Sequence, residues 1–157
     1  MAALAAGLLL TSCGQSEPSE DSTVFDGLDS SVVREVMDSP VAWGKVLQEE
    51  EQTRDSMAQG IVRNFIQCRS AFDAYRSWVT TGAAPDAPTL PEATHPIEPA
   101  NTAIVQAQEY IEAAIDSGEP AQLRDFLVGE ATCGEWIPVE EGRPDGPTIE
   151  DAVEALG

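Results

Sequence analysis

Residues 61–79 read IVRNFIQCRSAFDAYRSWV, and this stretch carries the clearest periodic pattern in the chain. Its apolar residues recur at spacings of four and three, a pattern typical of an α-helix buried along one face. Thr80-Thr81-Gly82 follows, where glycine readily takes the left-handed conformation that ends a helix. We expect this helix to be the core of the domain. The residues of its inward stripe are Ile61, Phe65, Cys68, Phe72, Tyr75 and Val79.

Two shorter helical signals precede this stretch. Residues 31–38 place four apolar residues on one face, and Ser30 or Ser31 is the expected N-cap. Ser39-Pro40 predicts a new helix, since serine is a good N-cap and proline suits the first helical position. That segment runs from Val41 to about Gln59, and Gly60 after it marks either a kink or no break at all.

A different pattern follows between residues 83 and 99, where five prolines remove backbone donors. We expect an extended crossover loop, resembling polyproline II, that wraps the helices. The alternative is a proline-rich ligand for an aromatic groove on a partner, although the spacing matches no particular recognition module.

Helical signals return after the prolines. Asn101 is the expected cap of a helix to Ser117, and Glu119-Pro120 opens another that ends near residue 130. Residues 133–138 predict a tight irregular segment. The last helix begins with a capping box in which Asp151 replaces the usual Glu, and its thin apolar strip predicts weak docking. The fold class is therefore all-α, a small irregular bundle of about four helices.

Charge restricts the class of partner. The 157 residues contain 28 Asp and Glu against 8 Lys and Arg, a formal net charge of −20. Such a surface repels phosphate backbones, so we expect no nucleic acid binding. Basic partners, cations or solubility alone remain as reasons for the acidity.

The N-terminus indicates where the protein works. An apolar run from Ala2 to Leu10 suits the core of a signal peptide and is too short to span a bilayer. The following Leu10-Thr11-Ser12-Cys13 resembles the lipobox of bacterial lipoprotein precursors. The resemblance implies that Cys13 receives a diacylglyceryl group and becomes the new N-terminus, anchored on the extracytoplasmic face of the cell membrane. Two acyl chains suffice for stable anchoring.

One feature departs from the lipoprotein pattern: no basic residue lies between Met1 and the apolar run. We interpret Met1 as an internal start, with the basic residues upstream. The alternative is a cytosolic protein with a chance apolar N-terminus. On the lipoprotein interpretation, residues 1–12 are the signal peptide, 13–29 a disordered acidic tether, 30–138 the helical domain, and 139–157 an acidic loop with a short helix.

The two remaining cysteines, Cys68 and Cys133, form an even pair in an oxidising compartment. We expect a disulfide between them, and the alternative is two buried free thiols.

Catalytic and metal-binding patterns are weak. The single histidine, His95, lies in the proline-rich stretch, so a Cys-His or Ser-His pair would depend on one exposed imidazole. Carboxylates gather in two loops, 26–29 and 140–146, but neither matches a calcium-binding loop. We expect no enzyme activity, no cofactor and no metal site.

The leading hypothesis is an envelope protein that presents a helical surface to an extracytoplasmic protein partner, and the alternative is a cation- or small-ligand-binding lipoprotein.

Overall fold

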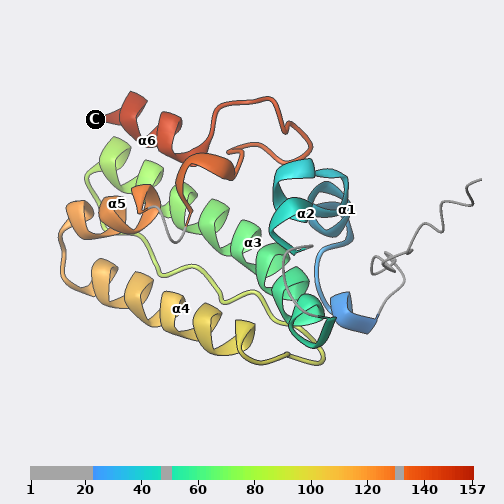
Figure 1. The fold of residues 1–157 in the computed structure, drawn as a ribbon. Helices are drawn as coiled ribbons and strands as arrows, with labels where there is room; N and C mark the ends of the chain where they lie inside the picture. The colour runs from blue at the N-terminus through green and yellow to red at the C-terminus, as the bar shows by residue number, and fades with distance from the viewer. Residues whose placement is uncertain (1–22, 47–50, 130–132) are drawn as a thin grey trace, which may run out of the picture.

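The computed structural model describes residues 23–46, 51–129 and 133–157, and all its regular elements are helical (Figure 1). The all-α class is confirmed, but the expected number of about four helices is too low. The region expected as one helix over 41–59 is divided between two helices, and the C-terminal helix is part of the bundle. The elements are η1 Thr23–Phe25, α1 Ser30–Asp38, α2 Pro40–Val46, α3 Glu51–Thr81, α4 Ala100–Asp116, α5 Pro120–Val128, η2 Gly134–Trp136 and α6 Ile149–Leu156.

Helix α3 is the central element, as its periodicity predicts. Its 31 residues span roughly 46 Å and continue through Gly60 without a break. Phe65, Cys68, Phe72 and Tyr75 are all buried. At the C-terminal end the prediction is wrong by one residue: Val79 is 38% exposed, and Trp78 is buried instead. The helix ends as expected, with the N–H of Gly82, at φ +74°, donating to the carbonyl of Trp78.

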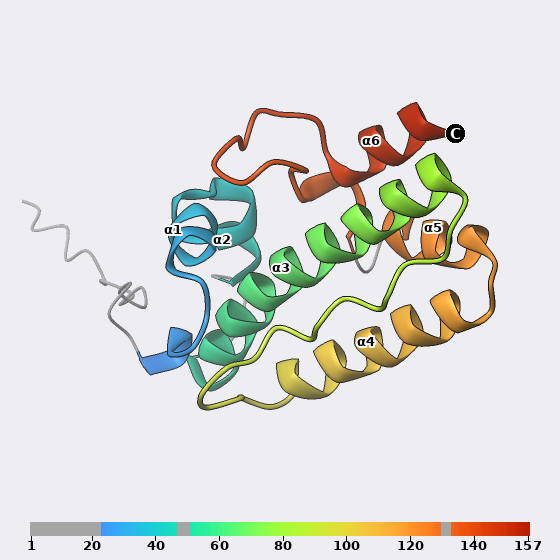
Figure 2. The ribbon, with the colours of Figure 1, turned by 180° about the vertical axis from the view of Figure 1, so that it is seen from behind.

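Helices α3 and α4 run in the same direction, so the chain must return along the bundle between them (Figures 1 and 2). Residues 83–99 make this return as an extended crossover, which confirms the expected loop. Figure 2 shows it lying along the seam between α3 and α4. The crossover thus covers one side of this helix pair.

Buried polar side chains hold the crossover in place, and sequence periodicity did not identify them. The Gln59 amide donates to the carbonyl of His95 and accepts from the N–H of Ile97, both at 2.9 Å. Arg63 donates through Nε to the carbonyl of Pro91 at 3.0 Å. Burial lowers the pKa of Arg63, and the charge of Glu98 opposes that effect. Two carbonyls of a loop without regular structure, those of Pro91 and His95, are thereby satisfied by α3.

The N-terminal part of the domain begins earlier than expected. Val24 and Phe25 in η1 are buried in the core, so the tether predicted over residues 13–29 is wrong from residue 23 onward. Asp29, rather than Ser30 or Ser31, caps α1 by accepting from the N–H of Ser31. Ser39 caps α2 as predicted. The signal peptide, the lipobox and Cys13 lie outside the described residues.

The C-terminal part packs firmly. Ile149 and Val153 of α6 are fully buried, and α6 lies against α3 and α5, so the predicted weak docking is wrong. The capping box between Thr148 and Asp151 is present. Residues 139–157 therefore belong to the same hydrophobic core as the rest of the bundle. No helix in the described part of the chain is both long and apolar enough to cross a membrane.

The start of α4 differs from the prediction. Asn101 lies inside the helix, and the position before the helix is Pro99, which has no capping side chain. Glu98 supplies the missing acceptor, since its carboxylate accepts from the backbone N–H of Thr102 at 3.2 Å and from the amide of Asn101 at 3.1 Å. The hydroxyl of Thr102 also donates to this carboxylate. The three hydrogen bonds, chiefly the one from the Thr102 hydroxyl, lower the pKa of Glu98.

Candidate functional site

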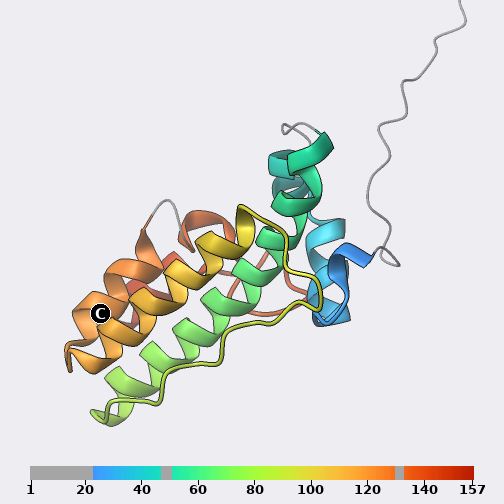
Figure 3. The ribbon, with the colours of Figure 1, turned by 90° about the horizontal axis from the view of Figure 1, so that it is seen from below.

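An apolar groove forms where α5 stops short of the helices that it covers. Helix α4 has 17 residues and spans about 25 Å, whereas α5 has nine residues and spans about 13 Å. Figure 1 shows α5 over the C-terminal halves of α3 and α4, on the side opposite the crossover. The N-terminal halves of both helices therefore have no helix of the described chain laid over them there. Figure 3 views α3, α4 and α5 from below.

The groove has a volume of about 1290 Å³ and is open on one side. That volume exceeds the roughly 300–1,000 Å³ usual for small-molecule pockets. Most of its lining is apolar or small, and five elements contribute, including α2 through Lys45. The main lining residues are Met57, Gly60 and Ile61 from α3, Ala103, Ala107 and Tyr110 from α4, Phe126 from α5, and Trp136 from η2.

Aromatic rings form the walls. Tyr110 stacks on Phe126 with ring centroids 5.7 Å apart, yet it is 48% exposed, a large exposure for a ring in an apolar setting. Trp136 is half-buried and meets the buried ring of Phe65 edge-on at 5.3 Å. The Lys45 ammonium lies 4.9 Å from the centre of the Trp136 ring. Two aromatic residues with one packed side and one accessible side resemble the anchors of protein-binding surfaces.

The disulfide positions the Trp136 wall. Cys68 and Cys133 are bonded, with Cα atoms 5.5 Å apart, so the predicted pairing is confirmed. Cys133 is three residues before Trp136 and is fully buried on α3. The bond therefore attaches η2 to α3 and brings Trp136 to the edge of the groove.

Small residues form the floor at one end. A Cβ added to Gly60 would lie 2.8 Å from the Cβ of Ala100, so α3 and the start of α4 approach as closely as their backbones allow. The buried hydroxyl of Ser56 accepts from the N–H of Ala100 at 3.2 Å at the same place. Gly60 thus marks a close contact between α3 and the start of α4.

The negative charge around the groove comes from the chain as a whole. Lys45 and Asp125 are the charged residues that line the groove. Helix α4 carries Glu109, Glu112 and Asp116 and contains no Lys or Arg, but Glu112 lies on the crossover side, where it accepts from the amide of Gln108, which also donates to the carbonyl of Pro88. The net charge of −20 places the apolar surface of the groove inside a negative field.

The other predicted site residues do not come together. His95 is exposed in the crossover, and its backbone carbonyl accepts from Gln59. In the first acidic loop the Asp29 carboxylate caps α1, and hydrogen bonds from Ser31 lower its pKa. In the second, Glu140 pairs with Arg143 at 2.6 Å in an exposed position, and this contact raises the pKa of Arg143. Across residues 23–46, 51–129 and 133–157, no three His, Cys, Asp or Glu side chains gather as a metal site would need.

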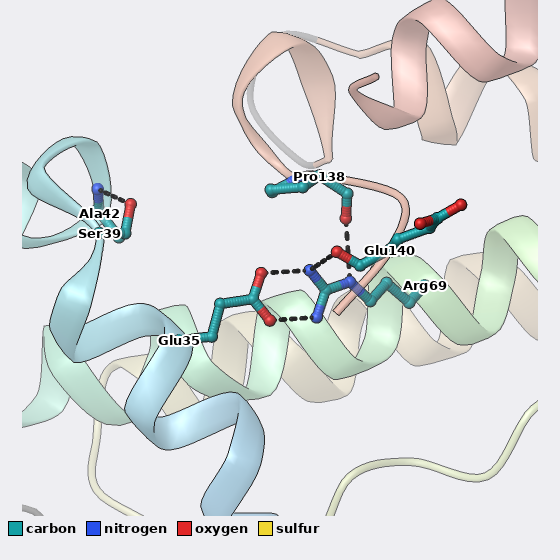
Figure 4. Close-up of polar contacts among 6 residues, drawn as sticks. All are labelled: Glu35, Ser39, Ala42, Arg69, Pro138 and Glu140. Atoms are coloured by element: carbon teal, nitrogen blue, oxygen red, sulfur yellow. Dashed lines mark hydrogen bonds and ion pairs between the residues drawn. The ribbon is translucent and has the colours of Figure 1, made fainter. Parts of the chain in front are cut away.

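Sequence reasoning also missed a buried ion pair next to the second acidic loop. Figure 4 shows Glu35 of α1 facing Arg69 of α3, whose guanidinium also reaches the carbonyls of Pro138 and Glu140. Neither residue breaks the helical pattern around it, so the sequence contained no signal for the pairing.

Comparison with known proteins adds no relative: no protein-family model matches the chain, and neither the curated proteins nor the solved structures returned a match. The fold and the groove therefore define the class only as a disulfide-linked all-α domain with an apolar surface groove.

Proposed function

We propose that this chain is a lipid-anchored protein of the cell envelope, and that its helical domain binds an extracytoplasmic protein through the groove between α3, α4 and α5. The observation that carries the proposal is the groove itself. Concave sites lined mainly by apolar and aromatic side chains are where proteins preferentially bind their ligands and partners. Here the groove is bordered by the half-exposed rings of Tyr110 and Trp136.

The lipid anchor is supported by Leu10-Thr11-Ser12-Cys13 and by the disulfide. Stable disulfides are characteristic of exported proteins, because the cytosol keeps most thiols reduced. Cys68 and Cys133 agree with a domain on the outer side of the membrane, and Cys13 is the residue that would carry the diacylglyceryl group.

Metabolic labelling tests the anchor. The protein is expressed in its native cells from its own locus, labelled with a palmitate analogue, and compared with a Cys13→Ser variant. We expect label and membrane fractionation for the wild type, and loss of both for the variant. An unlabelled wild-type protein with an intact N-terminus in the cytosol would overturn the proposal.

Site-specific cross-linking tests the binding surface. A photoreactive amino acid replaces Ala103, which lines the groove, or Ala113, an exposed alanine of the same helix outside it. In intact cells we expect a discrete adduct from position 103 and none from position 113. Equal adducts at both positions, or none at either, would count against the groove as the interface.

The cation-binding alternative has less support. Asp29 is engaged as a helix cap and Glu140 in an ion pair, so these carboxylates would have to exchange existing contacts for a cation. Calorimetric titration with Ca²⁺ separates the two hypotheses. Saturable heat at millimolar or tighter affinity would favour the cation binder, and a flat trace would remove it.

A further inference from the structure

Resting on the proposed function above, we propose that the occupant of the groove is a short amphipathic helix with basic residues beside its apolar face, supplied by another protein. Three features of the groove support this occupant: its length, the sizes of the side chains that line it, and the charge around it.

The length fits about two helical turns. Since α4 exceeds α5 by eight residues, about 12 Å of its length lies beyond α5, which corresponds to roughly two turns. Helix α5 already shows how a helix lies on this pair, with Leu123, Phe126 and Leu127 buried against it. A partner helix placed end to end with α5 would extend the same layer.

The side chains in the groove favour bulky apolar anchors on the partner. Ala103 and Ala107 of α4 are small, so a partner helix can approach closely or insert a long side chain above them. Tyr110 and Trp136 also line the groove, and each is partly exposed and can contact such a side chain. Leu, Phe or Met at i, i+3 or i+4, and i+7 is the pattern of helix-in-groove recognition.

The charge selects a basic partner. The chain carries a formal net charge of −20, so the field around the groove is negative. A field of this sign attracts Lys and Arg on the flanks of a bound helix and repels an anionic amphiphile such as a fatty acid. We therefore favour a basic peptide over a free lipid, and the test includes both.

The experiment uses the full-length chain carrying Cys13→Ser and a fluorescein-labelled Leu/Lys peptide of about 14 residues, with leucines at helical spacing. A scrambled peptide of the same composition has the same charge and no apolar face. We expect saturable one-to-one binding, with affinity about tenfold weaker for the scrambled peptide, as fluorescence anisotropy measures it. Salt at about 0.5 M should weaken but not abolish the binding, because the apolar contact remains.

Two variants locate the site. Ala103→Arg and Ala113→Arg make the same change at exposed positions of α4, and only the first lies in the groove. We expect Ala103→Arg to weaken peptide binding about tenfold and Ala113→Arg to have a much smaller effect, since only the first fills the groove. Tyr110→Ala removes a wall without changing charge and should also weaken binding. Circular dichroism melts check that each variant folds.

Three outcomes would overturn the inference. They are equal binding of the ordered and scrambled peptides, equal effects of the two arginine variants, and binding of palmitate in the groove by a protein that ignores the peptide. None of them bears on the lipid anchor or on the adduct from position 103 in cells, because palmitate labelling at Cys13 and cross-linking are measured separately. Failure of this inference is thus distinguishable from failure of the proposed function.

Discussion

Glu35 and Arg69 form a two-point ion pair between α1 and α3, with N–O distances of 2.5 and 2.8 Å (Figure 4). Their side chains are 5% and 13% exposed. Arg69 also donates through Nε to the carbonyl of Pro138 at 2.9 Å. One guanidinium therefore joins α1, α3 and the segment that leads to α6, three parts of the chain that are distant in sequence.

Breaking this pair should be costly. Glu35→Gln leaves the buried Arg69 cation without its partner charge, and such changes cost about 3–5 kcal/mol. The matched control is Glu140→Gln, which removes the exposed pair with Arg143 and should cost less than about 1 kcal/mol. Urea denaturation measures both. Similar losses in the two variants would show that burial of the Glu35–Arg69 pair does not matter.

The disulfide should contribute strongly to stability. Cys68 and Cys133 are separated by 65 residues, and closing a loop of that length stabilises a domain by about 4 kcal/mol in the chain-entropy model. We expect the melting temperature to fall when reductant is added and to fall similarly in the Cys68→Ala/Cys133→Ala double variant. Reductant should then have no further effect on the double variant. An unchanged melt of the wild type under reductant would contradict this prediction.

Two helical glycines should respond in opposite directions to alanine. Gly60→Ala places a Cβ 2.8 Å from that of Ala100 and should destabilise the fold by about 1–3 kcal/mol, despite the better helix propensity of alanine. A Cβ added to Gly44 in α2 would have no neighbouring atom within 4 Å. Gly44→Ala should therefore stabilise the fold by about 0.5–1 kcal/mol, because alanine has the better helix propensity. Thermal melts measure both changes. The double variant Gly60→Ala/Ala100→Gly should recover most of the loss, and failure to recover would place the strain elsewhere.

The crossover should depend on Gln59. Its amide donates to the carbonyls of Val24 and His95 at 2.9 Å, and Glu at this position would turn an acceptor toward both. Gln59→Glu should therefore destabilise by at least about 1–3 kcal/mol and speed hydrogen exchange at the amide of Ile97. Gln106→Glu, at an exposed position of α4, is the control and should change stability by less than about 0.5 kcal/mol. Unchanged exchange at Ile97 in Gln59→Glu would contradict the role given to Gln59.

Acid should weaken the helix starts. Hydrogen bonds lower the pKa of Asp29, Glu98 and Asp151, chiefly from the Ser31 hydroxyl, the Thr102 hydroxyl and the Thr148 N–H respectively. A carboxyl with a lowered pKa in the folded state contributes stability above its unfolded value, 3.8 for Asp and 4.5 for Glu. That contribution is lost as the pH falls through the folded pKa. Urea midpoints measured from about pH 7 to about pH 2.5 should fall at the acid end.

Glu98→Gln identifies one of these groups. It removes the titrating carboxylate at the start of α4, so the variant should be less stable at neutral pH and lose less stability on acidification. Glu154→Gln, in the exposed face of α6, is the control. A pH profile for Glu98→Gln that matches the wild type would show that this carboxylate does not contribute.

Much of the fold could be predicted because helices leave a local record in the sequence. The stripe from Ile61 to Tyr75, the left-handed glycine at 82 and the serine-proline start at 39–40 each depend on residues close together in the chain. The candidate site could not be predicted in the same way. Tyr110, Phe126 and Trp136 lie on three separate elements, and nothing in the local pattern of any of them shows that α5 leaves α4 partly uncovered.

The sequence by itself determined the all-helical class, the crossover and the pairing of Cys68 with Cys133, because periodicity, proline content and cysteine number are properties of the chain alone. Only the tertiary structure decided which polar residues are buried and where the groove lies. Glu35 and Gln59 look like ordinary polar positions on helices, and they become structural because elements distant in sequence pack against them. The physical reason is that burying a charge or an amide is tolerated only where a partner is present, and that partner is supplied by the fold.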